Sequence, residues 1–193
     1  MARPKGFDPG EAMQEAMEAF WERGYHATSV SDLLAEMKLN RGSLYGTFGD
    51  KKSLFLAALS EYERQGRQAM REILQRPGSA RDAITQWVVE SGRQTVGESG
   101  QKGCLGLKAA MEMAPQDRDV ADWAREVARQ RERLLAKTIR RGQAEGEIDP
   151  GLDARAVARY LVTALAGLRV VGVSAPTERE VSEVVELILR VLR

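Results

Sequence analysis

The sequence predicts an all-α protein with a small N-terminal head of three short helices and a larger helical body. Apolar residues recur three and four positions apart along most of the chain, whereas alternation of β-branched residues is almost absent. Capping residues and Gly or Pro breaks divide this pattern into about nine segments of helical length. We therefore expect a small head domain in residues 1–50 and a second, larger domain in residues 51–193.

The three helices of the head are short and closely spaced. Each has a side chain suited to accept hydrogen bonds from the first turn, and a tight turn at residues 38–40 separates the second helix from the third, residues 41–48. The residues that begin or end them are Asp8, Pro9, Glu11 and Gly24 for the first, Thr28 or Ser29 for the second, and Asn40 for the third.

The body begins with a long helix over residues 51 to about 75, which Asp50 can cap. Pro77 and Gly78 form the clearest break in the chain. The glycine-rich residues 97–103 predict a flexible turn. The remaining helices are expected at residues 80–96, 105–113, 117–145 and 152–173, and from the Thr177–Glu180 capping box onward.

Short helices around a tight turn are typical of a helix-turn-helix, in which the third helix lies in the major groove of DNA. Gly42 and Ser43 are small, so the start of this helix can approach DNA closely, and its free N–H groups favour phosphate. The polar side chains that can then reach DNA are Arg41 and Thr47 at base edges or phosphates, Tyr45 at the backbone, and Lys51 at a phosphate.

Residues 39–55, LNRGSLYGTFGDKKSLF, closely resemble the recognition segment of the TetR family of repressors. Phe20, Gly24-Tyr25 and Thr28-Ser29-Val30 are similar to the first two helices of that family, and the resemblance is specific over about residues 10–59. Many members carry an aromatic residue and a histidine where this chain has Gly46 and Thr47. The resemblance implies DNA contacts at Thr28, Arg41, Gly42, Ser43, Tyr45, Thr47 and Lys51.

The same resemblance implies a head joined by a long fourth helix to a body that binds a ligand and forms a dimer. The last two helices carry more apolar surface than one body needs, so we expect a homodimer built from them. The implied partners are double-stranded operator DNA and a small ligand or reactive electrophile that releases a repressor. Whether binding represses or activates transcription stays open at this point.

Cys104 is a candidate sensor residue. Gly103-Cys104-Leu105 and the residues 112–115, EMAP, resemble a TetR subgroup that includes sensors of electrophiles and oxidants. The start of a helix lowers the pKa of a thiol, and Lys102 and Lys108 are near in sequence and would favour the thiolate. The alternative is that Cys104 is a small buried hydrophobic residue.

A ligand pocket between the body helices is the second expected site. Its candidate lining residues are Trp87, Met111, Met113, Trp123 and Tyr160, and the alternative is that each is core. With His26 as the only histidine, neither a metal site nor a Ser-His-Asp triad is expected. No cofactor motif is visible, so the sequence does not predict an enzyme.

Composition agrees with this interpretation but does not prove it. The chain has 43% hydrophobic and 30% charged residues, an ordinary globular balance, and its net charge of +1 gives no support to DNA binding by itself. Cations instead gather locally, at Arg3 and Lys5 and in residues 38–52. The single cysteine, the absence of a long apolar run and an N-terminus unlike a signal peptide predict a cytoplasmic protein.

Overall fold

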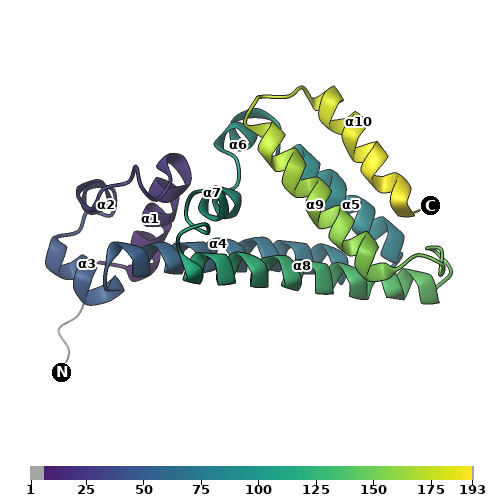
Figure 1. The fold of residues 1–193 in the computed structure, drawn as a ribbon, viewed down its shortest axis with the longest axis horizontal. Helices are drawn as coiled ribbons and strands as arrows, with labels where there is room; N and C mark the ends of the chain where they lie inside the picture. Colours follow the sequence, from purple (N-terminus) through teal and green to yellow (C-terminus); the bar gives the residue numbers. More distant parts are fainter. Residues whose placement is uncertain (1–6, 193) are drawn as a thin grey trace.

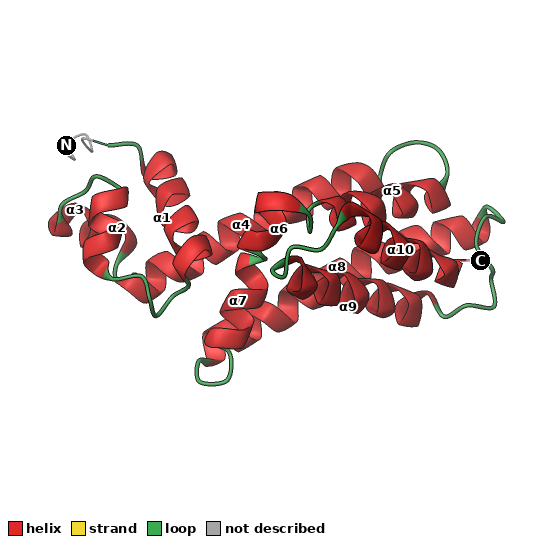
Figure 2. Ribbon diagram, turned by 90° about the horizontal axis from the view of Figure 1, so that it is seen from above, coloured by secondary structure: helices red, strands yellow, loops and turns green. Residues whose placement is uncertain are grey.

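In the computed structural model, which describes residues 7–192, the chain is all-helical, as the sequence predicts (Figure 1). The first three helices form one end of an elongated molecule, and a long helix joins them to the body (Figure 2). The helices of the head end and its connection are α1 (Pro9–Arg23), α2 (Val30–Glu36), α3 (Arg41–Phe48) and α4 (Lys51–Leu74). Those of the body are α5 (Ala80–Arg93), α6 (Gly97–Lys102), α7 (Leu105–Glu112), α8 (Arg118–Ala144), α9 (Ala154–Gly172) and α10 (Glu178–Leu189), with a last 3-10 turn, Arg190–Leu192.

Most helix boundaries follow from side-chain caps that the sequence predicts. Asn40 Oδ1 accepts the Ser43 N–H at 2.9 Å, and Asp50 Oδ1 accepts the Ser53 N–H at 2.7 Å. Ser29, rather than Thr28, is the N-cap of α2. Gly24 ends α1, and the capping box of α10 forms between Thr177 and Glu180.

The glycine-rich segment after α5 is folded where the sequence predicted a flexible turn. Residues 97–102 form α6, bracketed by Gly97 and Gly103 with φ of +67° and +72°. Gly100 in its middle is buried against the backbone, since a Cβ there would lie 2.1 Å from the Thr95 carbonyl oxygen. The expected turn is therefore a short helix, and Gly100 is needed there for close packing.

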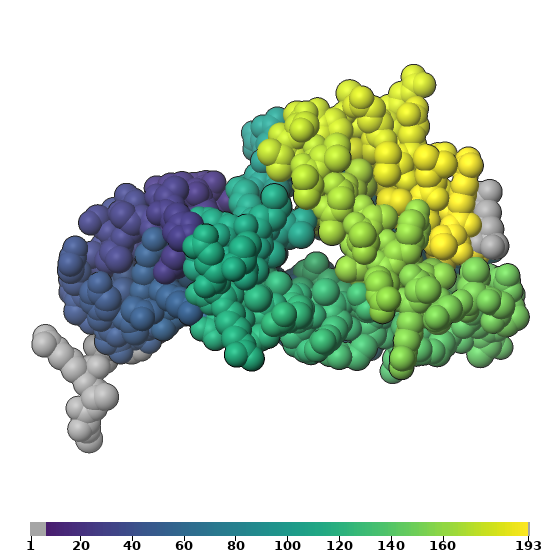
Figure 3. Space-filling model, viewed as in Figure 1, coloured from purple at the N-terminus to yellow at the C-terminus, as the bar shows by residue number. Residues whose placement is uncertain are grey.

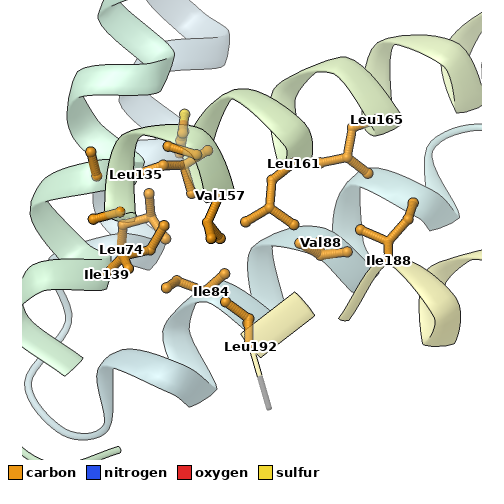
Figure 4. Close-up of a cluster of buried hydrophobic side chains, with 14 of the residues drawn as sticks. Leu74, Ile84, Val88, Leu135, Ile139, Val157, Leu161, Leu165, Ile188 and Leu192 are labelled. Carbon is orange, nitrogen blue, oxygen red and sulfur yellow. The ribbon is translucent and has the colours of Figure 1, made fainter. Parts of the chain in front are cut away.

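The body has an aliphatic core formed by α4, α5, α8, α9 and α10 (Figure 4). Leu135 and Ile139 of α8 meet Ile84 of α5 and Leu161 of α9, and all four side chains have 0% exposure. Complete burial of such a side chain contributes roughly 1.5–3 kcal/mol to stability. This core fixes the relative positions of five helices.

The head has a separate core that is richer in aromatic residues. Phe20 of α1 packs edge-on against Phe55 of α4, with ring centroids 4.9 Å apart. Leu105, the first residue of α7, Met113, its C-cap, and Val120 of α8 are buried in the same cluster. The head core is therefore completed by side chains of α4, α7 and α8, and the described residues 7–50 do not enclose it by themselves.

Apolar side chains remain exposed on the outer faces of α9 and α10, which join at the top of Figure 1. They are Tyr160, Val170, Val171 and Val173 along or just after α9, and Val184 and Leu187 on α10. Leu165 and Ile188 of the same helices are buried in the body core instead. In the described part of the chain, no helix is both long and apolar enough to cross a membrane.

Candidate nucleic-acid interface and effector region

The helix α3 is held to the head by one face and leaves the other open. Leu44 is fully buried in the head core, whereas Arg41, Gly42 and Tyr45 are exposed, Tyr45 by 45%. Because Asn40 takes the Ser43 N–H, the donors left for an anion at this helix start are those of the exposed Arg41 and Gly42. Arg41, Gly42 and Tyr45 therefore lie on one outward surface of α3.

Three further predicted contact residues are less exposed to solvent than Arg41, Gly42 and Tyr45. Ser43 and Thr47 are half-buried on α3, and a Cβ at the neighbouring Gly46 would meet nothing within 4 Å. Lys51, at the start of α4, is also half-buried, with its Nζ 4.3 Å from the centre of the Tyr25 ring. Burial lowers the pKa of Lys51, and the charges of Glu112 and Asp32 oppose this effect.

Thr28 is placed differently from the other predicted contacts. Its side chain has 0% exposure, and its hydroxyl donates to the Gly24 carbonyl at 2.6 Å and more weakly to that of Ala19. The hydroxyl thus closes the loop after α1, and neither the side chain nor the backbone of Thr28 is exposed for a DNA contact in this structure. A single sequence cannot distinguish a buried threonine from an exposed one beside a helix start.

Lys52, next to Lys51, belongs to the body side of the junction. Its Nζ lies 2.9 Å from Asp117 Oδ2 and 2.7 Å from Asp119 Oδ2, at the start of α8. Hydrogen bonds to these two carboxylates raise the pKa of Lys52. The cluster of cations expected in residues 38–52 is therefore partly neutralised, and the N-terminal cations Arg3 and Lys5 lie outside the described residues.

Cys104 lies at the start of α7, as the sequence predicts, and is half-buried. The Tyr62 hydroxyl of α4 donates to its Sγ at 3.6 Å. Burial, and secondarily the neighbouring Cys104, raise the pKa of Tyr62. Lys102 and Lys108 are engaged elsewhere, since Lys102 pairs with Glu18 and Lys108 donates to the Trp21 carbonyl. Figure 3 shows the molecule hollowed between α7 and α9.

The five predicted pocket residues do not line a common cavity. Trp87 packs against the body core, and Met113 and Trp123 contribute to the head core. Met111 is 71% exposed on α7, and Tyr160 is 45% exposed on α9. The helical spacing of these residues in the sequence carried no information on which helices lie next to one another in the fold.

Sequence reasoning missed the side chains that join α7 to the head. The Trp21 indole N–H donates to the Gly103 carbonyl at 3.0 Å, and Glu112 accepts the backbone N–H groups of Tyr25 and His26. Partners more than eighty positions apart leave no periodic signal in a single sequence. These contacts dock a three-helix head, whose helix α3 is open on its outer face, onto the helical body.

That arrangement defines a helix-turn-helix DNA-binding regulator, and comparison with known proteins identifies its family. Residues 12–58 match the family described as bacterial regulatory proteins, tetR family, and residues 88–173 match the tetracyclin repressor-like C-terminal domain. The uncharacterized HTH-type transcriptional regulator YezE of Bacillus subtilis (strain 168) is 34% identical over 162 residues, or 83% of this chain and 84% of YezE. The chain belongs to the TetR family of transcriptional regulators and is not an enzyme.

Other relatives extend the similarity along nearly the whole chain. The HTH-type transcriptional repressor ComR of Escherichia coli (strain K12) is 28% identical over 169 residues, covering 87% of this chain and 80% of ComR. A cysteine variant of the regulator CifR, solved with a 26-base-pair double-strand operator, has a TM-score of 0.89 at 31% identity, with both chains fully covered. Reduced NemR of E. coli shares the fold, with a TM-score of 0.84 at 19% identity over 95% of this chain and 97% of NemR.

Proposed function

We propose that this protein is a homodimeric repressor that binds operator DNA through α3 and is released by a small effector acting beside Cys104. The observation that carries the proposal is the outward surface of α3 on a chain similar over its full length to CifR, which was solved on operator DNA. Repression is favoured over activation because ComR, BdcR and NemR are all described as repressors. A protein that binds bacterial operator DNA acts in the cytoplasm.

The proposed division of labour follows the two parts expected from the sequence, residues 1–50 for DNA and residues 51–193 for the ligand and the dimer. Arg41 and Thr47 would read base edges, whereas Tyr45 and Lys51 would bind the backbone and set the register. Gly42 and Ser43 would let the helix start approach a phosphate. Thr28 would act by holding the loop after α1 in place, since it is fully buried and its hydroxyl donates to the Gly24 carbonyl.

The dimer would form through the exposed apolar faces of α9 and α10. Burying these faces against a second copy removes apolar surface from water, and a two-fold axis would pair the two heads. Paired heads read half-sites in successive major grooves, roughly 34–36 Å apart or a multiple of that. A single head would offer too few contacts for tight operator binding.

The effector would act where α7 begins. A thiol-reactive electrophile would alkylate Cys104, the sulfur forming the new bond as its proton is lost to solvent, and would displace the Tyr62 hydroxyl. A non-covalent ligand in the same region is the rival account. Either effector must bind the DNA-incompetent state more tightly, because a ligand indifferent to the two states shifts nothing.

The test is an anisotropy titration against DNA from upstream of the protein's own coding sequence. Wild type should bind at nanomolar concentration, and a variant with Arg41, Tyr45 and Lys51 all changed to Ala should not. N-ethylmaleimide should weaken wild-type binding and leave Cys104→Ser unaffected. Retained binding by the triple variant would refute the assignment of the head, and equal loss in wild type and Cys104→Ser would leave a non-covalent effector.

A further inference from the structure

We propose that Glu112 is a positioning residue for DNA binding: its carboxylate clamps the turn after α1 and so sets the head and Lys51 on the body. The segment from Gly103 to Glu112 is then a second mechanical connection between body and head, separate from the continuous helix α4. This inference rests on the proposed DNA binding by α3 and Lys51.

The clamp uses both oxygens of one carboxylate on two adjacent backbone donors. Glu112 Oε2 accepts the Tyr25 N–H at 2.9 Å, and Oε1 accepts the His26 N–H at 2.6 Å. Hydrogen bonds from neutral donors to an ionised acceptor are about twice as strong as neutral pairs. The clamp thus fixes the orientation of this turn, and not merely its distance from α7.

Gly24 is the residue that permits this approach. Its φ of +82° is in the left-handed region, and a Cβ at this position would lie 2.8 Å from Glu112 Oε2. The same glycine ends α1, so the turn into α2 and the seat of the carboxylate depend on one position. A side chain here would strain the turn and push the carboxylate away.

The clamp reaches the proposed DNA surface through Tyr25. The Tyr25 ring lies 4.9 Å from the Phe55 ring and carries the Lys51 ammonium on one face, 4.3 Å from its centre. The charge of Glu112 also raises the pKa of Lys51, against the lowering effect of burial. Displacing Glu112 therefore moves both the surface that supports Lys51 and a charge that favours its ammonium form.

Other contacts of the same segment tie Cys104 into this connection. On one side of Cys104, the Gly103 carbonyl accepts from Trp21; on the other, Lys108 donates to the Trp21 carbonyl at 2.8 Å. The Tyr62 ring, whose hydroxyl bonds Cys104, packs edge-on against the Trp21 ring at 5.1 Å. Cys104 is thus connected to α1 by two routes, through its neighbour Gly103 and through Tyr62 of α4.

The junction beside the clamp is open. A groove of about 380 Å³ lies there, lined by Arg23, Gly24, Lys108, Met111 and Glu112. Water can therefore take the two N–H groups when the carboxylate is lost, so a variant at this position can loosen the turn while leaving the buried head core intact.

The experiment compares wild type with Glu112→Ala and Glu112→Gln, and uses Met111→Ala, at an exposed neighbour on α7, as the matched control. Hydrogen exchange of the peptide spanning residues 21–28 should be at least about tenfold faster in Glu112→Ala, and operator affinity about tenfold weaker. Glu112→Gln should be intermediate, because its amide keeps one acceptor oxygen in place of two. Met111→Ala should match wild type in both measurements.

Two further readouts separate positioning from a merely structural role. In a double-mutant cycle, Glu112→Ala should cost less operator affinity when Lys51 is already alanine; fully additive losses would overturn the link to Lys51. Unchanged exchange and affinity in Glu112→Ala would overturn the clamp. If wild type bound no operator, the proposed function would fail, while the exchange comparison would still decide whether the clamp exists. Glu112→Gln provides the same comparison if Glu112→Ala does not fold.

Discussion

The two ends of the molecule are stabilised in different ways. The body core is aliphatic and is enclosed by its own helices, whereas the head core contains stacked aromatic rings and borrows side chains from α7 and α8. The outer surfaces differ as well, since exposed apolar side chains gather on α9 and α10, and α3 presents polar residues. Because the two cores are separate, we expect the body to keep its fold when the contact between the head and α7 is weakened.

The largest effect is expected from the apolar outer face of the body. Val184→Glu combined with Leu187→Glu should give a folded monomer, because both side chains are exposed on α10. Specific operator binding should then fall by roughly 10³-fold or more, toward the non-specific level. Sedimentation and DNA titration measure the two results. Ser182→Glu, at an exposed position on another face of α10, is the control, and a stable dimer of the double variant would refute this interface.

The second prediction compares the two cores directly. Leu161→Ala in the body and Leu44→Ala in the head each remove a fully buried side chain and should cost about 2–5 kcal/mol locally. The body variant should lower the urea midpoint of the main unfolding transition and weaken the dimer. The head variant should lose operator binding and keep the dimer, as measured by urea unfolding and sedimentation. Identical shifts of the main transition in both variants would mean that the two cores unfold as one.

Adjacent lysines at the start of α4 sharpen the contrast between the DNA side and the body side. Lys51→Ala should weaken binding to all sequences alike and reduce the salt dependence by about one phosphate contact. Lys52→Ala, which removes an ion pair with α8, should leave that salt dependence unchanged. Equal salt slopes for the two lysine variants would contradict the assignment of Lys51.

Arg41→Ala should weaken binding to the operator, but not to other DNA, by about 1–3 kcal/mol if Arg41 reads a base.

Local signals in the sequence predicted the secondary structure because caps and periodicity act within a few residues. Asn40, Asp50 and the Thr177–Glu180 box all begin helices where they were expected to. The exception is α6, since glycine serves both flexibility and close packing, and only the contact of Gly100 with Thr95 distinguishes the two. The family resemblance supplied what local signals could not, the arrangement of head, α4 and body.

The site was predicted in part, for the same physical reason. The face of α3 follows from helical geometry, so its exposed residues could be predicted from spacing. The burial of Thr28, the scattering of the five proposed pocket residues and the clamp by Glu112 depend on contacts between distant segments. On the apolar helices α9 and α10, Leu165 and Ile188 are buried in the core while Val184 and Leu187 are exposed, and the sequence pattern alone does not separate the two groups.

The smallest effect is expected at the ion pair that joins the base of α4 to α8. Asp117 is the N-cap of α8, accepting the N–H groups of Asp119 and Val120, and it also pairs with Lys52. Asn caps helices as well as Asp does, so Asp117→Asn removes the charge and keeps the cap. Stability near pH 7 should fall slightly, and less than in the other variants, because the pair is partly exposed to solvent and Lys52 keeps its second partner, Asp119.

The pH dependence of that variant gives the sharper test. The hydrogen bond from Lys52 holds the pKa of Asp117 below its ordinary value of 3.8. A lowered folded pKa stabilises the protein above the ordinary value, and this contribution is lost as the pH falls through the folded value. Wild type and Asp117→Asn should therefore differ in urea midpoint near pH 7 and converge once the pH falls below the lowered pKa of Asp117 in the folded protein. High salt should also reduce the difference at neutral pH. If the difference in urea midpoint persisted unchanged in acid, the substitution would be disturbing the helix cap and not the charge of Asp117.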